Sequence, residues 1–218
     1  MCRMLLAVGE FDTDALVAGF LKMARGFGEL NEHNTSPGAF THGDGWGALV
    51  RRDGALVAYH SARPCWEEDV RAIVGEPEGL LLLHARRGPN PSLENCHPFR
   101  GFHGHEFWFA HQGDVWEPLP DTGCYGTTDS ERLLHELLAA EPDLRRLLHH
   151  ENFSALNCFL VGPRVQVLSR RKTNPRYNTL RIARLPRATI VSSERISGIT
   201  CWQALPDGTF IELPLSGL

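Results

Sequence analysis

The chain has 218 residues, of which 42% are apolar and 22% charged, and its net charge is −4. These proportions are typical of a globular protein, and the length predicts one domain over residues 1–218. The pI near 6.2 gives no sign of the basic face that nucleic-acid-binding proteins carry, so no nucleic-acid partner is expected.

No window approaches the ~20 consecutive apolar residues that cross a bilayer, so no membrane partner is expected. The chain start lacks signal-peptide architecture. Six scattered cysteines without a CxxC pair favour reduced thiols in the cytoplasm over a disulfide framework. The clusters His103-Gly104-His105 and His149-His150 lack the ligand spacing of a zinc site, so no metal site is expected.

Apolar runs and alternating patterns predict five strands in the first part of the chain, at 4–8, 46–51, 55–60, 80–83 and 106–111. Asp53-Gly54 predicts a hairpin turn between the second and third of these. Helices are predicted at 14–25, 67–74 and 130–140, with a further helical turn from 142 to about 150. The polar stretch 31–42 is predicted to be a loop.

The first predicted helix has an N-cap in Asp12-Thr13-Asp14 and one apolar face formed by Val17, Phe20, Leu21 and Ala24. The last third predicts strands at 155–161, 165–169, 179–184, 189–192, 204–205 and 209–213. Asp207-Gly208 predicts a turn that pairs the last two strands. Many strands, few helices and no regular βαβ alternation indicate an α+β fold with mainly antiparallel sheets.

Cys2 becomes the first residue if Met1 is removed, and initiator methionine is usually trimmed before a small side chain. The trimmed chain would carry a thiol and a free α-amine on one residue. An α-amine titrates near ~8, against ~10.4 for lysine, so it can act as a base near neutral pH. A nucleophile activated by its own amine is a known arrangement for covalent catalysis. The alternative is that Cys2 has no chemical role.

Two motifs offer groups for substrate binding. The stretch His42-Gly43-Asp44-Gly45-Trp46-Gly47 lets the backbone approach a ligand closely, or it is simply a turn before a strand. In His84-Ala85-Arg86-Arg87-Gly88, an arginine at a strand end matches a carboxylate bidentately, or it is a solvated surface residue.

Two later motifs add further polar groups. In Ala110-His111-Gln112-Gly113, a glycine N–H and the neighbouring side-chain amide could donate to an oxyanion, or the glycine only makes a turn. In Gly126-Thr127-Thr128-Asp129-Ser130-Glu131, a carboxylate at a helix start could hold an ammonium group or only cap the helix.

Together with Cys2 and Asn95-Cys96-His97-Pro98-Phe99, these motifs resemble in order and spacing the class II glutamine amidotransferases, which are N-terminal-nucleophile hydrolases. The likeness covers nearly the whole chain and is greatest to small stand-alone members, including the γ-glutamyl hydrolase type of ergothioneine biosynthesis. Val191-Ser192-Ser193-Glu194 and the segment 202–208 also look like that subgroup.

The resemblance implies a four-layer αββα sandwich that hydrolyses a γ-glutamyl amide through a glutamyl thioester on Cys2, without a cofactor. It implies that Gly113 and the Gln112 side chain bind the oxyanion. The residues it implies for substrate binding are Arg86 for the α-carboxylate, Asp129 for the α-ammonium group, His84 and Trp46.

Two departures from the family pattern leave alternatives open. The family usually has asparagine in place of Gln112, and Arg87-Gly88-Pro89 lacks the hydroxyl or amide side chain expected after Arg86. One alternative is therefore a binding protein for a glutamyl ligand that has weak or no activity. Another is a glutaminase subunit: the length leaves no room for a synthase domain, so ammonia transfer would need a separate synthase partner.

Overall fold

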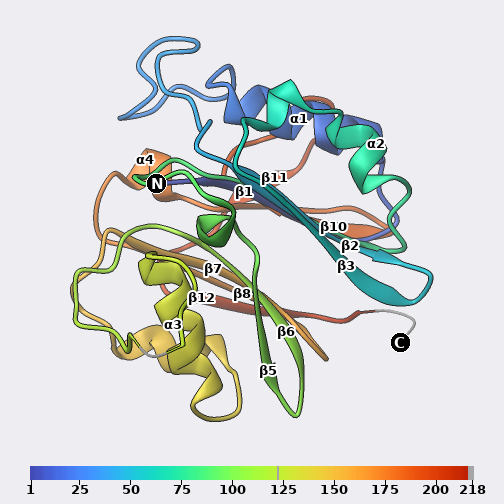
Figure 1. Ribbon diagram of the computed structural model, residues 1–218. Helices are drawn as coiled ribbons and strands as arrows, with labels where there is room; N and C mark the ends of the chain where they lie inside the picture. Colours follow the sequence, from blue (N-terminus) through green and yellow to red (C-terminus); the bar gives the residue numbers. More distant parts are fainter. Residues whose placement is uncertain (122, 216–218) are drawn as a thin grey trace.

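A computed structural model describes residues 1–121 and 123–215. Two β-sheets are stacked face to face, and helices cover the outer face of each (Figure 1). Every pairing between the strands is antiparallel. The predicted α+β, four-layer αββα architecture is therefore confirmed.

The first sheet has seven strands in the order β11-β9-β10-β1-β4-β2-β3. In chain order these are β1 (Arg3–Gly9), β2 (Trp46–Arg52), β3 (Ala55–Ser61), β4 (Leu80–Ala85), β9 (Arg181–Arg184), β10 (Ala188–Ser192) and β11 (Trp202–Ala204). On its outer face lie α1 (Thr13–Ala24) and α2 (Val70–Val74), the latter preceded by a 3-10 turn, η1 (Cys65–Glu67).

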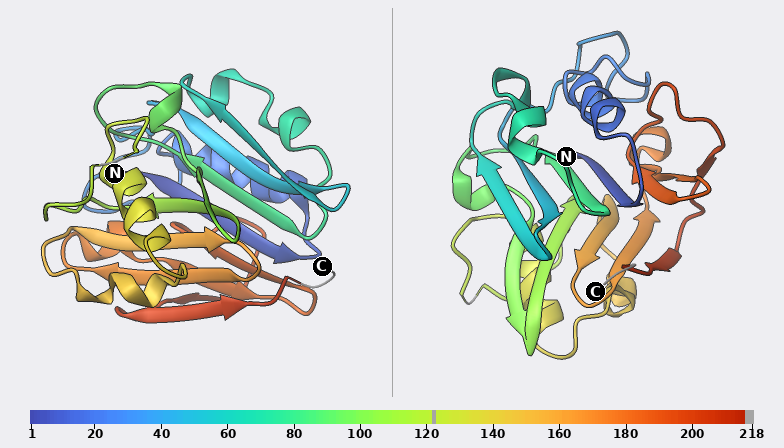
Figure 2. Two further views of the ribbon diagram at one scale, coloured as in Figure 1. Left: turned by 60° about the horizontal axis from the view of Figure 1, so that its bottom comes forward. Right: turned by 90° about the vertical axis from the view of Figure 1, so that its right-hand side faces the viewer.

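The second sheet has five strands in the order β12-β8-β7-β6-β5. They are β5 (Phe99–His103), β6 (His105–Gln112), β7 (Ala155–Val161), β8 (Val165–Arg171) and β12 (Thr209–Leu213). Its outer face is covered by α3 (Asp129–Leu138) and the 3-10 segment η3 (Leu144–His149). The left view of Figure 2 brings this side of the molecule, with α3 in yellow, to the front. The short elements η2 (Leu93–Asn95) and α4 (Pro175–Asn178) lie in connecting loops.

Strand β1 lies in the middle of the first sheet and is buried on both faces. Leu5 and Ala7 pack against α1 and α2, whereas Met4, Leu6 and Val8 pack against the second sheet. This explains the uninterrupted apolar run at 4–8, because successive strand residues point to opposite faces. No helix within the described residues is long and apolar enough to cross a bilayer.

Three details of the predicted elements are wrong. The strands predicted at 204–205 and 209–213 do not pair: the first lies at Trp202–Ala204 as β11 and joins β9 in one sheet, whereas β12 joins β8 in the other. The helix predicted at 67–74 starts only at Val70, because the Asp69 side chain caps it by accepting from Ala72 N. Strand β5 was not predicted; it forms a hairpin with β6 through Gly104.

Replacing Leu6 by alanine should lower the free energy of unfolding by about 2–5 kcal/mol, because the side chain is fully buried between the two sheets. The measurement is urea denaturation followed by circular dichroism. The matched control is Leu93→Ala, at a leucine 55% exposed, which should change the value by no more than about 0.5 kcal/mol. Equal losses for the two variants would contradict the described core.

Candidate active site

Antiparallel pairing at the start of β1 brings three of the motifs together. Ala85, near the end of β4, pairs with Arg3 on one side and with Trp46 on the other. Cys2 and Arg86 therefore lie at the same edge of the sheet. At this edge Arg86 N donates to Gly45 O at 2.8 Å, and Asp44 N donates to Arg86 O at 3.0 Å, so the glycine-rich turn and the arginine segment fix each other.

A cavity of about 190 Å³ opens at this edge. Four residues of the sequence-predicted site line it, namely Cys2, Arg86, Gly113 and Asp129. They come from the start of β1, the end of β4, the turn after β6 and the first turn of α3. The other lining residues are Met1, Arg87, Gly88, Pro89, His97, Asp114, Thr127, Thr128 and Ser130.

Arg86 presents a buried positive charge to this cavity. Its side chain is 5% exposed, and its guanidinium donates to backbone carbonyls only, those of Asp44 (3.4 Å), Gly88 (3.2 Å) and Pro89. Among the described residues no carboxylate forms an ion pair with it. A desolvated arginine without a counter-ion is suited to bind an anion such as a carboxylate.

Asp129 presents the opposite charge. Its Oδ2 accepts from Val115 N at 2.7 Å and its Oδ1 from Ser130 Oγ at 3.3 Å. The N-cap of α3 is instead Thr128, which accepts from Glu131 N at 3.2 Å. Asp129 too makes no ion pair with any described residue. The cavity wall thus includes an arginine and an aspartate without ion-pair partners, which complement the two charges of an α-amino acid.

Gly113 is fixed as glycine by its surroundings. Its φ is +146°, and a Cβ built on it would lie 1.9 Å from Ala155 O. Any larger residue would have to displace the backbone of β7, so this turn lines the cavity with backbone and no side chain.

The Gln112 side chain lies in the interior and not in the cavity. Its Nε2 donates to Tyr177 O at 3.3 Å and to Asn178 Oδ1 at 3.4 Å, and its Oε1 accepts from Ser193 Oγ at 2.5 Å. The side-chain amide would have to leave these partners before it could donate to an oxyanion, as the resemblance implied.

Two further predicted substrate-binding residues also lie away from the cavity lining. Trp46 is fully buried in the core between the first sheet and its helices, where Nε1 donates to Glu68 Oε2 at 2.6 Å. His84 is fully buried behind His97, with the two rings stacked at 3.9 Å between centroids. Both residues support the site from within the fold.

Sequence reasoning assigned no role to Arg3, Tyr177 and Glu194, which hold Cys2 in place. Arg3 pairs with Glu194 at 2.9 Å, and both side chains are almost completely buried. The Arg3 guanidinium also lies 3.7 Å from the ring centroid of Tyr177, whose hydroxyl donates to Cys2 O at 3.2 Å. The available signal was an arginine inside an apolar strand, since a buried charge requires a partner.

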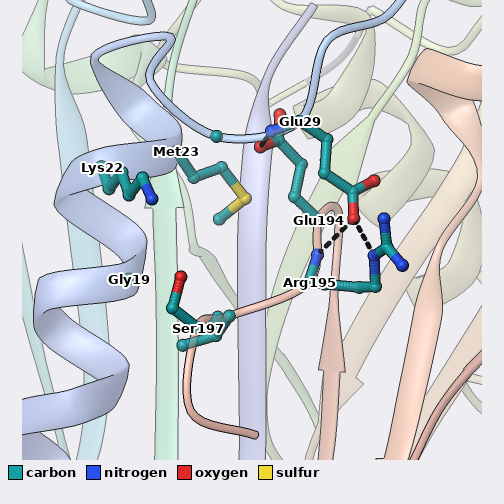
Figure 3. Close-up of a pocket in the computed structure, with 9 residues that line it drawn as sticks. Gly19, Lys22, Met23, Glu29, Glu194, Arg195 and Ser197 are labelled. Atoms are coloured by element: carbon teal, nitrogen blue, oxygen red, sulfur yellow. Dashed lines mark hydrogen bonds and ion pairs between the residues drawn. The ribbon is translucent and has the colours of Figure 1, made fainter. Parts of the chain in front are cut away.

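A second cavity, of about 230 Å³, lies behind Glu194 and beside α1 (Figure 3). Its Glu29 carboxylate is already paired with Arg195 and, at 2.8 Å, with Arg181. Glu194 itself accepts from Glu29 N at 2.7 Å and pairs with Arg3. The carboxylates of this cavity are therefore paired with arginines, whereas Asp129 has no ion-pair partner among the described residues.

The fold and the cavity define a class: a two-sheet sandwich of the N-terminal-nucleophile type, with a cysteine near the chain start in its cavity. Residues 26–156, more than half of the chain, match the family described as class-II glutamine amidotransferases. The chain belongs to this family. No relative was found among curated proteins.

Solved structures share the fold at low sequence identity. The glutamine phosphoribosylpyrophosphate amidotransferase from B. subtilis is 15% identical with a TM-score of 0.70, and 97% of this chain covers 47% of that protein. A predicted glutamine amidotransferase from Pseudomonas aeruginosa PA01 is 14% identical with a TM-score of 0.53, and the match covers 100% and 95% of the two chains. A glutamine aminotransferase class-II domain protein from Silicibacter pomeroyi is 17% identical with a TM-score of 0.57, and the match covers 99% of this chain and 96% of that protein. This chain thus spans about half the length of the phosphoribosylpyrophosphate enzyme.

Acid should destabilise the fold through the histidines behind the cavity. Burial lowers the pKa of His84 to about 3, whereas an unfolded histidine takes up its proton near ~6.5. Between these values the unfolded chain binds more protons, so the free energy of unfolding falls as the pH is lowered from ~6.5 towards 3. One such site contributes about 1.4 kcal/mol per pH unit.

The test is urea denaturation at several pH values between 4 and 6. His84→Gln should reduce the slope of unfolding free energy against pH by up to about 1.4 kcal/mol per unit. The exposed His105 supplies the control, since His105→Gln should leave the slope unchanged. An unaltered slope in His84→Gln would show that this ring is not the acid-sensitive group.

Proposed function

We propose that the chain hydrolyses a γ-glutamyl amide through a thioester on Cys2 and releases glutamate. The observation that carries this is the lining of one cavity by a cysteine, an unpaired arginine and an unpaired aspartate. An arginine fork binds the α-carboxylate and an aspartate binds the α-ammonium group. The γ-carbonyl of a substrate held in this way would extend towards Cys2.

In the proposed reaction the Cys2 α-amine, freed by removal of Met1, takes the thiol proton. The thiolate then attacks the amide carbon, and the carbonyl oxygen becomes an oxyanion that accepts from Gly113 N–H. Collapse breaks the C–N bond, and the amine returns its proton to the leaving ammonia or amine. Water then attacks the thioester, which regenerates the thiol and releases glutamate.

Removal of Met1 is a condition of this reaction. In the full chain Met1 N donates to Arg87 O at 2.6 Å, and Met1 forms part of the cavity wall. Trimming would place the amine on Cys2 and enlarge the cavity at the same point.

The substrate is glutamine itself or a larger γ-glutamyl metabolite, and product analysis with each distinguishes the two. Transfer of the released ammonia to an acceptor would use a separate synthase partner. All six cysteines of this chain are free thiols, which supports the cytoplasm as the location of the protein.

Cys2→Ala should lower glutamate release by about 10⁴-fold or more, because no thioester can form. Intact mass spectrometry should find the mature wild-type chain without Met1 and with a covalent adduct from a γ-glutamyl electrophile. The matched control is Cys201→Ser at an exposed cysteine, which should keep both the adduct and the rate. Full turnover by Cys2→Ala would exclude this nucleophile.

Arg86→Gln and Asp129→Asn should each lower kcat/KM by about 10²-fold, since each removes one partner of a desolvated ion pair with the substrate. Arg86→Gln should have no such effect on 4-aminobutanamide, which is glutamine without its α-carboxylate. Arg100→Gln, at an exposed arginine paired with Glu106, is the control. An equal loss with both substrates would refute the carboxylate assignment.

The alternative is a glutamyl-binding protein without turnover, which the interior position of the Gln112 amide favours. Calorimetry with glutamate separates the two functions. Tight binding that is unchanged in Cys2→Ala, with no glutamate released from either substrate class, would support the alternative.

A further inference from the structure

Three ligand atoms converge at the far end of α3. They belong to Glu136 on this helix and to His149 and His150 at the end of η3, and all lie within 4.8 Å of one another. The Nε2 atoms of His149 and His150 lie 3.5 and 3.3 Å from the two oxygens of Glu136.

The hydrogen bonds of both rings involve Nδ1, so that each Nε2 faces Glu136. His149 Nδ1 lies 2.6 Å from Arg146 O, and His150 Nδ1 lies 2.6 Å from Glu117 Oε2. A carbonyl and a carboxylate only accept, so each Nδ1 carries a proton and the Nε2 of each neutral ring is an acceptor. His150 is 2% exposed, and its Nε2 has no hydrogen-bond partner although it points at Glu136.

Glu117 fixes the orientation of the buried imidazole. Its Oε2 accepts from His150, and its Oε1 accepts from the backbone N–H groups of Glu151 and Asn152. Metal-bound histidines commonly donate from their other ring nitrogen to a carboxylate, which fixes the orientation of the imidazole.

The charged groups around Glu136, His149 and His150 also favour the binding of a cation. Within the part of the chain that the structure describes, no arginine or lysine pairs with Glu117 or Glu136. The neighbouring cations are otherwise engaged: Arg146 donates to the carbonyls of Glu136 and Leu137, Arg170 to that of His150, and Lys172 pairs with Glu151. The only cationic partners within reach of these two carboxylates, among the described residues, are the two histidine rings themselves.

We propose that Glu136, His149 and His150 bind a divalent transition-metal ion of the zinc type. Neighbouring ligands about 2.0–2.1 Å from a tetrahedral zinc lie roughly 3.3 Å from each other. His149 Nε2 lies 3.5 Å from Oε1 of Glu136 and His150 Nε2 lies 3.3 Å from its Oε2, so each ring is at this spacing from one of the two carboxylate oxygens. The His149 side chain is 63% exposed, so solvent can reach the site and supply the fourth ligand.

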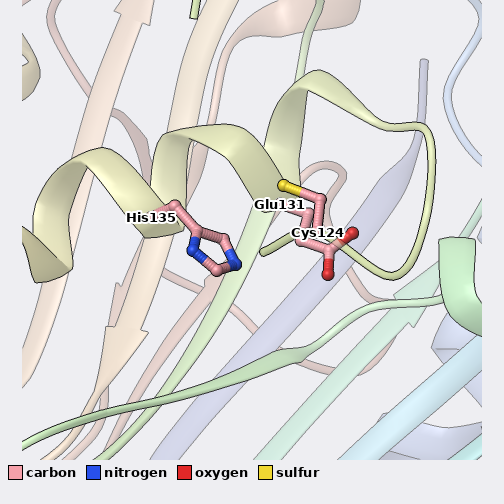
Figure 4. Close-up of side chains that lie close together, drawn as sticks. All are labelled: Cys124, Glu131 and His135. Atoms are coloured by element: carbon pink, nitrogen blue, oxygen red, sulfur yellow. The ribbon is translucent and has the colours of Figure 1, made fainter. Parts of the chain in front are cut away.

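A second group is a weaker candidate: it combines Glu131 and His135 of α3 with Cys124 of the preceding loop (Figure 4). Both oxygens of Glu131 already accept backbone N–H groups, from Tyr125 and Gly126 at 2.8 Å each. This carboxylate holds the loop before α3, and no second-shell acceptor orients His135 among the described residues. It therefore serves as the comparison site.

An ion at the Glu136 site would tie η3 to α3, and through Glu117 it would fix the segment that follows Val115. Val115 N donates to Asp129 at the other end of α3. The site is thus distant from the cavity of Cys2 along the helix and connected to it through the backbone.

The test is a zinc titration of the full chain by calorimetry, with the stoichiometry measured after equilibrium dialysis. One ion per chain is expected, and His149→Ala and Glu136→Gln should each weaken zinc affinity at least about tenfold. Glu117→Gln should weaken it by about 10–100-fold, as loss of a second-shell acceptor does. His149 is exposed, so its variant should fold even if a His150 variant does not.

The controls are His105→Ala on the surface and Cys124→Ser with His135→Ala at the comparison site, all of which should retain the zinc affinity. Absence of bound zinc in the wild-type chain would overturn the proposal. Binding lost in Cys124→Ser and His135→Ala but kept in His149→Ala would do the same. Neither result depends on enzymatic activity, so a failed glutaminase assay leaves this test unaffected.

Discussion

The position of Cys2 depends on the buried ion pair between Arg3 and Glu194. Desolvation of two charges is expensive, and removal of one partner from such a pair costs about 3–5 kcal/mol. Burial raises the pKa of Glu194, and Arg3 acts in the opposite direction. The pair is completed by Tyr177, whose carbonyl accepts from Arg3 at 3.1 Å and whose hydroxyl donates to Cys2 O. Segments from the beginning and the end of the chain thereby fix the residue before β1.

Much of the candidate site could be predicted from the sequence because each motif lies at the beginning or the end of an apolar strand or opens a helix. Strand ends at one edge meet, so Cys2, Arg86, Gly113 and Asp129 line one cavity. The direction of the Gln112 side chain could also be predicted, because alternate residues of a strand point to the same face of the sheet. Gln112 lies two residues after Ala110, which packs between the sheets, so both point to the interior. The resemblance of the motif to the family does not by itself indicate to which face the Gln112 side chain points.

The elements that were missed depend on tertiary pairing. Asp207-Gly208 is a genuine turn, but a local turn signal does not say which sheet each flanking strand joins. Strand β5 contains Gly101 and several exposed residues, so its alternation is weak. It becomes a strand because Phe99 and its neighbours pair with β6 and because Phe99 joins the core beneath α3. Packing here outweighs propensity.

The attachment of Cys2 explains why the chain could lose Met1 without losing the site. The contacts that fix Cys2 lie on its own carbonyl and on residues after it: Tyr177 holds the carbonyl, and Arg3 is buried and hydrogen-bonded in β1. Met1 contributes a hydrogen bond from its amine to Arg87 O. Trimming would remove this one donor from the Arg87 carbonyl and leave the contacts of Cys2 and Arg3 in place. If Met1 is removed as proposed, these contacts on Cys2 are kept, and the cleavage would supply the α-amine that the proposed reaction uses as its base.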